Sequence, residues 1–180
     1  MRQSKKEIKD QTVIEDLLTT CAVGRLGTIG QDGYPMVKPL NFAYLDKKIY
    51  FHSAREGEKI DDIKRDSRVC FEIDLPIAFV KSTGSPCKAE YLYRSVIAKG
   101  RAHLVEEPSE RLLALKGLME KYQPEGGYED FPEEKVNRTG IVRIDLEEMI
   151  GKEDLGREGL KDAVLKALEE NLQLPITLEQ

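Results

Sequence analysis

The spacing of hydrophobic residues changes along the first third of the chain. Ile8, Val13, Ile14, Leu17 and Leu18 fall on one helical face, so the pattern predicts an amphipathic helix over residues 5–20. Beyond residue 21 the apolar residues come in short runs separated by Gly, Pro and Asp, which is typical of strands joined by turns. These runs predict strands over residues 22–29, 35–45, 48–54, 67–75, 91–105 and 140–146.

Helical spacing returns in three places: at 57–66, at 109–122 with Ser109 as the N-cap, and over about 157–172 near the C-terminus. Stretches with Pro and Gly predict loops over 76–88 and 123–139. The Asp-Gly of "QDGY" predicts a hairpin turn, and Gly100 predicts a bend or bulge inside its strand. Closely spaced strands with only short helices between them argue against a doubly wound parallel sheet. We therefore expect a mainly β, single-domain protein over residues 1–180, with an antiparallel barrel and helices packed outside it.

Length, charge and cysteine content exclude several classes of function. The chain has 180 residues and a net charge of -5, so general attraction to nucleic acid or membrane surfaces is not expected. Three cysteines without a CxxC spacing and two histidines give no metal site. The charged start "MRQSKKEIKD" has no apolar signal-peptide core, and no apolar run is long enough for a membrane helix. We expect a cytoplasmic protein with reduced thiols.

One predicted strand, "YPMVKPLNFAY", contains Pro39 at its centre. Proline cannot donate to a β-ladder, so this strand is expected at a sheet edge or with a bulge. An edge leaves backbone N–H and C=O groups unpaired. Two interpretations are open. The edge is protected and has no binding role, or its unpaired backbone groups bind a flat ligand with its own donors and acceptors, such as a flavin ring. Asn41, with both donor and acceptor atoms, could contact the edge of such a ring.

The turn at 53–59 collects a hydroxyl, two cations and a glycine immediately before a predicted helix. Ser53, Arg55 and Lys59 offer donors, and Gly57 allows close backbone approach. The N-terminus of a helix adds free N–H groups and the positive end of the helix dipole. The pattern is compatible with a phosphate site, although it lacks the ending of a Walker loop, and equally with a solvated helix start.

Several motifs together resemble a known family. "GRLGT", "PLNF", "YFHSA" followed by "GEK", and "YRSVIAKGRA" resemble the pyridoxamine 5'-phosphate oxidase-like flavin-binding split-barrel proteins, and within them the nitroimidazole-resistance (Nim) branch. The resemblance covers about residues 10–150. It implies a six-stranded split barrel and a homodimer that binds FMN between its subunits.

The resemblance also implies cofactor-binding positions. The strand residues Lys38, Pro39, Leu40 and Asn41 would lie along the isoalloxazine ring; His52, Ser53 and Ala54 would line the ribityl-phosphate path; Lys59 would hold the phosphate, with Arg55 and Gly57 helping; and Tyr93, Arg94 and Ser95 would come from the other subunit. The basic residues that true pyridoxamine phosphate oxidases use for their phosphorylated substrate have no counterpart here.

Single residues keep two interpretations. His52 is either structural or a proton donor to a substrate over the flavin, because its ordinary pKa is near neutral. It alternates with Ser53, so a regular strand would point the two side chains to opposite faces. Cys21 and Cys70 are expected as core residues and Cys87 as an exposed loop thiol.

The function expected from these residues is an FMN-dependent oxidoreductase that reduces nitro-aromatic or other small electrophiles. Two alternatives stay open. One is a flavin- or haem-binding module without turnover, and the other is a reductase that uses the deazaflavin F420.

Overall fold

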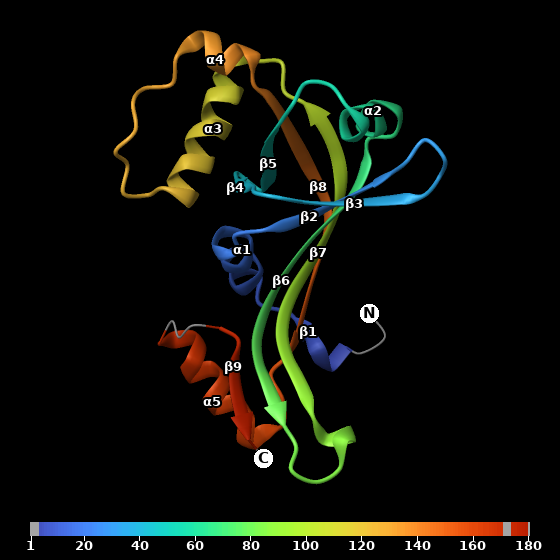
Figure 1. The fold of residues 1–180 in the computed structure, drawn as a ribbon, viewed down its shortest axis with the longest axis vertical. Helices are drawn as coiled ribbons and strands as arrows, with labels where there is room; N and C mark the ends of the chain where they lie inside the picture. Colours follow the sequence, from blue (N-terminus) through green and yellow to red (C-terminus); the bar gives the residue numbers. More distant parts are fainter. Residues whose placement is uncertain (1–3, 171–173, 180) are drawn as a thin grey trace.

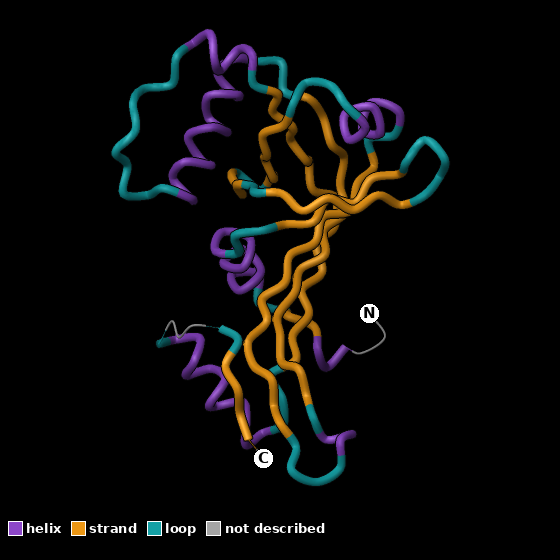
Figure 2. Tube along the Cα trace, in the orientation of Figure 1, coloured by secondary structure: helices purple, strands orange, loops and turns teal. Residues whose placement is uncertain are grey.

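The computed structural model describes residues 4–170 and 174–179, and it is built around one long, strongly twisted sheet (Figures 1 and 2). The strands are β1 (Glu7–Ile8), β2 (Gly24–Ile29), β3 (Pro35–Leu40), β4 (Ala43–Leu45), β5 (Lys48–Ser53), β6 (Arg68–Lys81), β7 (Glu90–Leu104), β8 (Gly140–Asp154) and β9 (Ile176–Glu179). The α-helices are α1 (Gln11–Thr20), α2 (Glu58–Arg65), α3 (Pro108–Tyr122), α4 (Glu133–Arg138) and α5 (Glu158–Glu169). Short 3₁₀ turns cover Ser4–Lys6 and Pro86–Lys88.

The sheet closes on itself through the segment that carries Pro39. The strand order is β3-β2-β6-β7-β8-β5-β4, so β3 and β4 stand at opposite ends of the sheet. Only Asn41 and Phe42 separate these two strands in sequence. The expected strand 35–45 is therefore interrupted, and its two halves pair with opposite edges. Counted as one interrupted strand, β3 and β4 complete a six-stranded antiparallel barrel, and the predicted split-barrel fold is confirmed.

The interior of the barrel is aliphatic and aromatic. Phe42 and Phe71 are fully buried and meet edge to face with 4.9 Å between ring centres. Gly24 is needed opposite Phe71, because a Cβ at this glycine would lie 2.1 Å from the ring. Leu17 and Leu18 of α1 complete the core.

β6, β7 and β8 run on past the barrel as a long ribbon (Figure 2). β9 extends this ribbon by pairing with the edge of β6 in parallel, and α5 packs on one face of it. Ile77, Val80, Leu92 and Val164 form a second, separate core there. Phe79 and Tyr91, directly opposite each other in the ladder, remain exposed on the other face.

Several predicted boundaries differ from the structure. The N-terminal helix starts at Gln11, because Asp10 caps it by accepting the Thr12 N–H; residues 7–8 instead pair with β8. The helix at 109–122 begins at Pro108 with Glu107, not Ser109, as its N-cap. The loop expected at 76–88 is strand up to Lys81, since the register shift next to Pro76 accommodates the missing N–H.

Towards the C-terminus the strand expected at 140–146 continues to Asp154. The loop at 123–139 contains α4, and the terminal helix covers Glu158–Glu169, so residues 171–172 of that prediction lie outside the described part. The bulge predicted at Gly100 is confirmed by a register shift between Lys99 and Gly100. No helix within the described residues has the length and apolarity required to cross a membrane.

Candidate functional site

A pocket of about 410 Å³ lies where the end of β5 meets the start of α2. It is lined by Lys38, His52, Ser53, Ala54, Glu56, Gly57, Glu58, Lys59 and Ile60. Six of these, from Lys38 to Lys59, are residues that the sequence assigned to cofactor binding. His52 and Ser53 both reach the pocket, because it wraps around the last two residues of the strand.

The N-terminus of α2 supplies the polar floor of this pocket. Gly57 is the N-cap with φ of 113°, a conformation that favours glycine. Its carbonyl accepts the N–H groups of Ile60 and Asp61. The N–H groups of Glu58 and Lys59 precede any possible helical acceptor, and no side chain among the described residues caps this end. Two backbone donors and the positive end of the helix dipole are therefore available to an anionic ligand.

Two lysines add positive charge to this floor. Lys38 pairs with Glu58 at 2.6 Å, and the Lys59 ammonium lies 5.0 Å from the centre of the Phe51 ring. Desolvation of the partly buried stem, with a smaller contribution from Lys38, lowers the pKa of Lys59. An anion bound beside Lys59 would counter both effects, because it favours the charged form.

α2 is held in place by an internal carboxylate that sequence reasoning did not single out. Asp62 is 2% exposed and accepts hydrogen bonds from Thr28 of β2, at 2.9 Å, and from Arg65, at 2.9 Å. Arg65 also donates to the Ile29 carbonyl. Burial alone would raise the pKa of Asp62, but the hydrogen bonds from Arg65 and Thr28 outweigh it and lower that pKa. A carboxylate in the middle of a short, highly charged helix normally faces solvent, so the sequence pattern does not predict that Asp62 is buried.

The Pro39 strand is an edge, as predicted. Among the described strands β3 pairs only with β2, with Pro39 opposite Arg25. Its side chains alternate: Val37, Pro39 and Asn41 are exposed, while Lys38 and Leu40 are half-buried. Lys38 alone of this group reaches the pocket.

Other predicted residues lie elsewhere. Arg55 points away from the pocket, towards the Asn137 carbonyl at 3.2 Å and Glu106 at 3.3 Å, so its expected place beside the phosphate is not the one observed. Tyr93, Arg94 and Ser95 lie on the ribbon of β7 and do not line the pocket of their own chain. Arg94 is paired with Glu153 at 3.0 Å. Because side chains alternate along β7, Tyr93 and Ser95 lie on the face of the ribbon opposite to Arg94.

One of the three cysteines differs from its predicted burial. Cys21 is buried, and desolvation raises the pKa of its thiol to about 11. Cys87 is exposed, as expected, but Cys70 is exposed too, because the alternation of β6 turns it outward.

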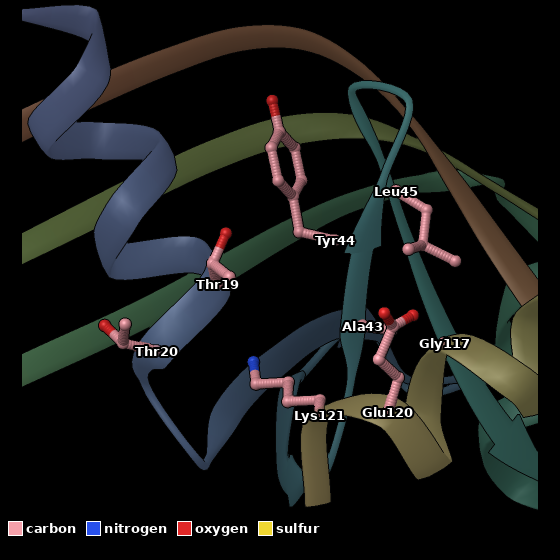
Figure 3. A pocket seen from close by; sticks show the side chains of 8 residues that line it. All are labelled: Thr19, Thr20, Ala43, Tyr44, Leu45, Gly117, Glu120 and Lys121. Atoms are coloured by element: carbon pink, nitrogen blue, oxygen red, sulfur yellow. The ribbon is translucent and has the colours of Figure 1, made fainter. Parts of the chain in front are cut away.

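A second pocket, of about 480 Å³, lies between α1, β4 and α3 (Figure 3). Its lining includes Tyr44 and Lys121, neither of which stood out in the sequence. Their positions could not be found from local patterns, because the pocket joins three elements that are distant along the chain.

A family model described as pyridoxamine 5'-phosphate oxidase matches residues 10–153. The chain belongs to this pyridoxamine 5'-phosphate oxidase family. The resemblance that the sequence motifs show to this family is thereby confirmed. The matched region contains the α2 pocket and both halves of the interrupted strand.

Solved structures of the same fold come from several bacteria. A candidate 5-nitroimidazole antibiotic resistance protein from Bacteroides thetaiotaomicron has 25% identity and a TM-score of 0.71, covering 81% of this chain and 85% of its own. The flavocytochrome Anf3 from Azotobacter vinelandii has 19% identity and a TM-score of 0.75, covering 87% and 72%. An FAD and haem binding protein from Mycobacterium smegmatis has 14% identity and a TM-score of 0.76, covering 90% and 80%. A search of curated protein sequences finds no match.

Proposed function

We propose that this family member binds FMN and uses it to reduce nitro-aromatic or other small electrophilic compounds. The observation that carries the proposal is the α2 pocket. It brings Lys38, His52, Ser53 and Lys59 to one helix N-terminus, beside an open strand edge, although they come from three separate elements. Family membership and the nitroimidazole-resistance neighbour support the same conclusion.

The phosphate of FMN would occupy the floor of the pocket. The free N–H groups of Glu58 and Lys59, the Ser53 hydroxyl and the Lys59 ammonium are all donors, which suits a phosphate dianion. Glu58 lines the same pocket, but Lys38 pairs with it and offsets its charge.

The isoalloxazine ring would lie along β3. Its pyrimidine edge carries both donors and acceptors. So do the backbone groups of β3 that point away from β2, and the exposed side chain of Asn41. The outer face of the ring would remain open in one subunit. A second copy related by a two-fold axis could cover it, and Tyr93 and Ser95 on the exposed face of the ribbon are the residues proposed to do so.

The chemistry divides between cofactor and protein. FMN supplies the capacity to accept and donate electrons. Ser53, Lys59 and the α2 N-terminus bind and orient it. His52 is exposed at the mouth of the pocket, and its imidazole would hold and deliver the proton that a reduced substrate takes up.

The test combines ligand identification with turnover. The small molecule that co-purifies with the protein is released by acid and identified by mass spectrometry, and apo-protein is then titrated with FMN, FAD and riboflavin. Flavin absorbance with tightest binding of FMN is the expected result. The loaded protein, reduced under anaerobic conditions, should be reoxidised by a nitroimidazole.

Three outcomes would contradict the proposal. A Soret band without flavin would favour a haem-binding module. A colourless protein that is active only with reduced F420 would favour the deazaflavin alternative. Bound FMN that reacts with no acceptor would leave a flavin-binding module without turnover.

A further inference from the structure

The pocket between α1, β4 and α3 is separate from the flavin site proposed above. It is lined by Thr19, Thr20, Ala43, Tyr44, Leu45, Gly117, Glu120 and Lys121, and none of these lines the α2 pocket. Figure 3 shows Tyr44 and Lys121 extending into the space between α1 and β4, whereas Leu45 and Glu120 lie on the other side of β4.

Tyr44 carries a polar atom without a partner. Its hydroxyl oxygen is buried and makes no hydrogen bond to any described residue. A hydroxyl buried in this way normally finds a protein or ligand partner, because an unmade hydrogen bond costs free energy.

Lys121 carries a positive charge without a counter-ion. Its ammonium donates to the Leu18 carbonyl at 3.1 Å and lies 3.6 Å from the centre of the Phe42 ring. It forms no ion pair with any carboxylate of the described chain. Desolvation lowers the pKa of Lys121 to about 8, which reflects the same uncompensated burial.

The rest of the lining offers these two donors no charged acceptor on their side of β4, because Glu120, the carboxylate of the lining, lies on the other side (Figure 3). The hydroxyls of Thr19 and Thr20 already donate to the carbonyls of Glu15 and Asp16 in their own helix. Ala43, Leu45 and Gly117 are apolar. A ligand that suits the pocket therefore needs an anionic acceptor for the ammonium and an apolar body, and a second acceptor at its far end would serve the tyrosine hydroxyl.

Charge limits the ligand further. Desolvation and, to a smaller extent, the nearby Glu15 carboxylate raise the pKa of Tyr44, and Glu120 is part of the lining. The C-terminal end of α1, where Thr19 and Thr20 lie, is the negative end of that helix dipole. One negative charge can be balanced by Lys121, but a dianion would be repelled.

We propose that this pocket binds a small organic monocarboxylate. Its carboxylate would rest on Lys121, and its apolar body would pack on the Tyr44 ring, which lies on the same side of β4 as Lys121 (Figure 3). A cavity of this size holds a ligand with about one aromatic ring and a short side chain.

The test uses 3-phenylpropanoate as the probe, with 3-phenylpropanol as its neutral counterpart and inorganic phosphate as the dianion. Binding to the full-length protein is measured by titration calorimetry and by broadening of the probe's NMR signals. 3-Phenylpropanoate should bind saturably, at least tenfold more tightly than the alcohol or phosphate. Prior loading with FMN should not displace it.

Matched variants assign the contacts. Lys121→Gln should weaken binding of the probe at least tenfold, as expected for losing a charge-assisted hydrogen bond. Tyr44→Ala, which removes the ring that the apolar body packs on, should weaken it by about threefold to tenfold. Lys116→Gln, which removes an exposed charge from the same helix, should change nothing. Lys121→Arg keeps the charge and should retain most of the binding, which guards against a simple folding defect in Lys121→Gln.

Two results would overturn the proposal. One is the absence of saturable binding of the probe to the wild type at about 10 mM, a concentration beyond millimolar affinity. The other is an equal effect of Lys116→Gln and Lys121→Gln. Neither result bears on the flavin site, so the two proposals fail independently.

Discussion

The Tyr122 hydroxyl accepts the backbone N–H of Phe42 at 2.9 Å and lies 2.7 Å from the Ala22 carbonyl, to which it donates. Phe42 stands at the break between β3 and β4, where the chain leaves one edge of the sheet and joins the other. A side chain from α3 thus replaces the ladder hydrogen bond that the interrupted strand gives up. The same break presents Asn41, directly before Phe42, to solvent.

Tyr122→Phe should therefore destabilise the fold. It leaves the buried N–H of Phe42 without an acceptor, at a cost of about 1–2 kcal/mol in the free energy of unfolding. Urea denaturation followed by circular dichroism measures it. Tyr128→Phe is the control, since that ring packs on Phe131 in the loop before α4. Equal unfolding midpoints for Tyr122→Phe and the wild type would show that the bridge does not stabilise the break.

Asp62 makes the stability of the fold depend on pH in the acidic range. Its pKa is lower in the folded protein than in the unfolded chain, so its contribution to stability is present above the unfolded-state pKa and is lost as pH falls through the folded pKa. Asp62→Asn should lower the free energy of unfolding by about 1–3 kcal/mol at pH 7, because Thr28 and Arg65 lose a charged partner.

The difference between Asp62→Asn and the wild type should shrink as the pH approaches 3, near the ordinary pKa of aspartate. Chemical denaturation at several pH values measures this difference. Asp61→Asn, a change at the exposed neighbour, should show no such trend. A difference that stays constant from neutral to acid pH would mean that Asp62 contributes through shape and not through charge.

Much of the barrel could be predicted from the sequence. Periodicity found the strands from residue 22 to residue 105, the edge strand from Pro39 and the bulge from Gly100, because each depends on local geometry. It ended β6 and β8 too early. Beyond Leu75 and Leu146, α5 packs on one face of the ribbon and β9 pairs with the edge of β6. Partners far along the sequence, not the local pattern, therefore decide that these residues pair.

The candidate site was predictable for the same reason. Ser53, Gly57 and Lys59 lie within one strand-turn-helix segment, whereas Lys38, on β3, was assigned from the family resemblance. Arg55 was assigned to the phosphate because it is close in sequence. In the structure its guanidinium instead donates hydrogen bonds to Glu106 and to the Asn137 carbonyl. Asp62, Tyr122 and the pocket at Lys121 depend on tertiary contacts between distant elements, for which a single sequence carries no pattern.

Assembly can be tested on the edge strand. Val37 is 63% exposed on the outer face of β3, where a second subunit would cover the flavin. Val37→Glu should convert the expected homodimer into a monomer and lower flavin affinity, because a buried carboxylate without a partner is costly at an interface. Sedimentation at micromolar concentration measures both mass and bound flavin. Leu113→Glu, at an exposed position on α3, is the control and should leave the dimer intact. A wild-type protein that is monomeric with flavin bound would contradict a flavin site shared between two subunits.

Phosphate anchoring can be tested at Lys59. Lys59→Met keeps an apolar stem next to the Phe51 ring but removes the charge. FMN affinity should fall roughly tenfold to a hundredfold, the equivalent of about 1.5–3 kcal/mol for a charge-assisted contact. Riboflavin, which lacks the phosphate, should bind the variant and the wild type alike. Lys64→Met, on the exposed side of α2, is the control; equal losses for both flavins would assign Lys59 to the fold.

His52→Gln decides whether the pocket performs chemistry. Glutamine keeps the size and polarity of the side chain but cannot deliver a proton near neutral pH, so the variant should bind flavin with an unchanged spectrum. Reoxidation of the reduced flavin by a nitroimidazole should slow by about 10²–10⁴-fold if proton transfer limits the rate. Anaerobic stopped-flow measures this rate, and reoxidation by dioxygen, which need not use the same donor, is the internal control. An unchanged nitroimidazole rate would make His52 a structural residue, and loss of the flavin would make it a binding residue.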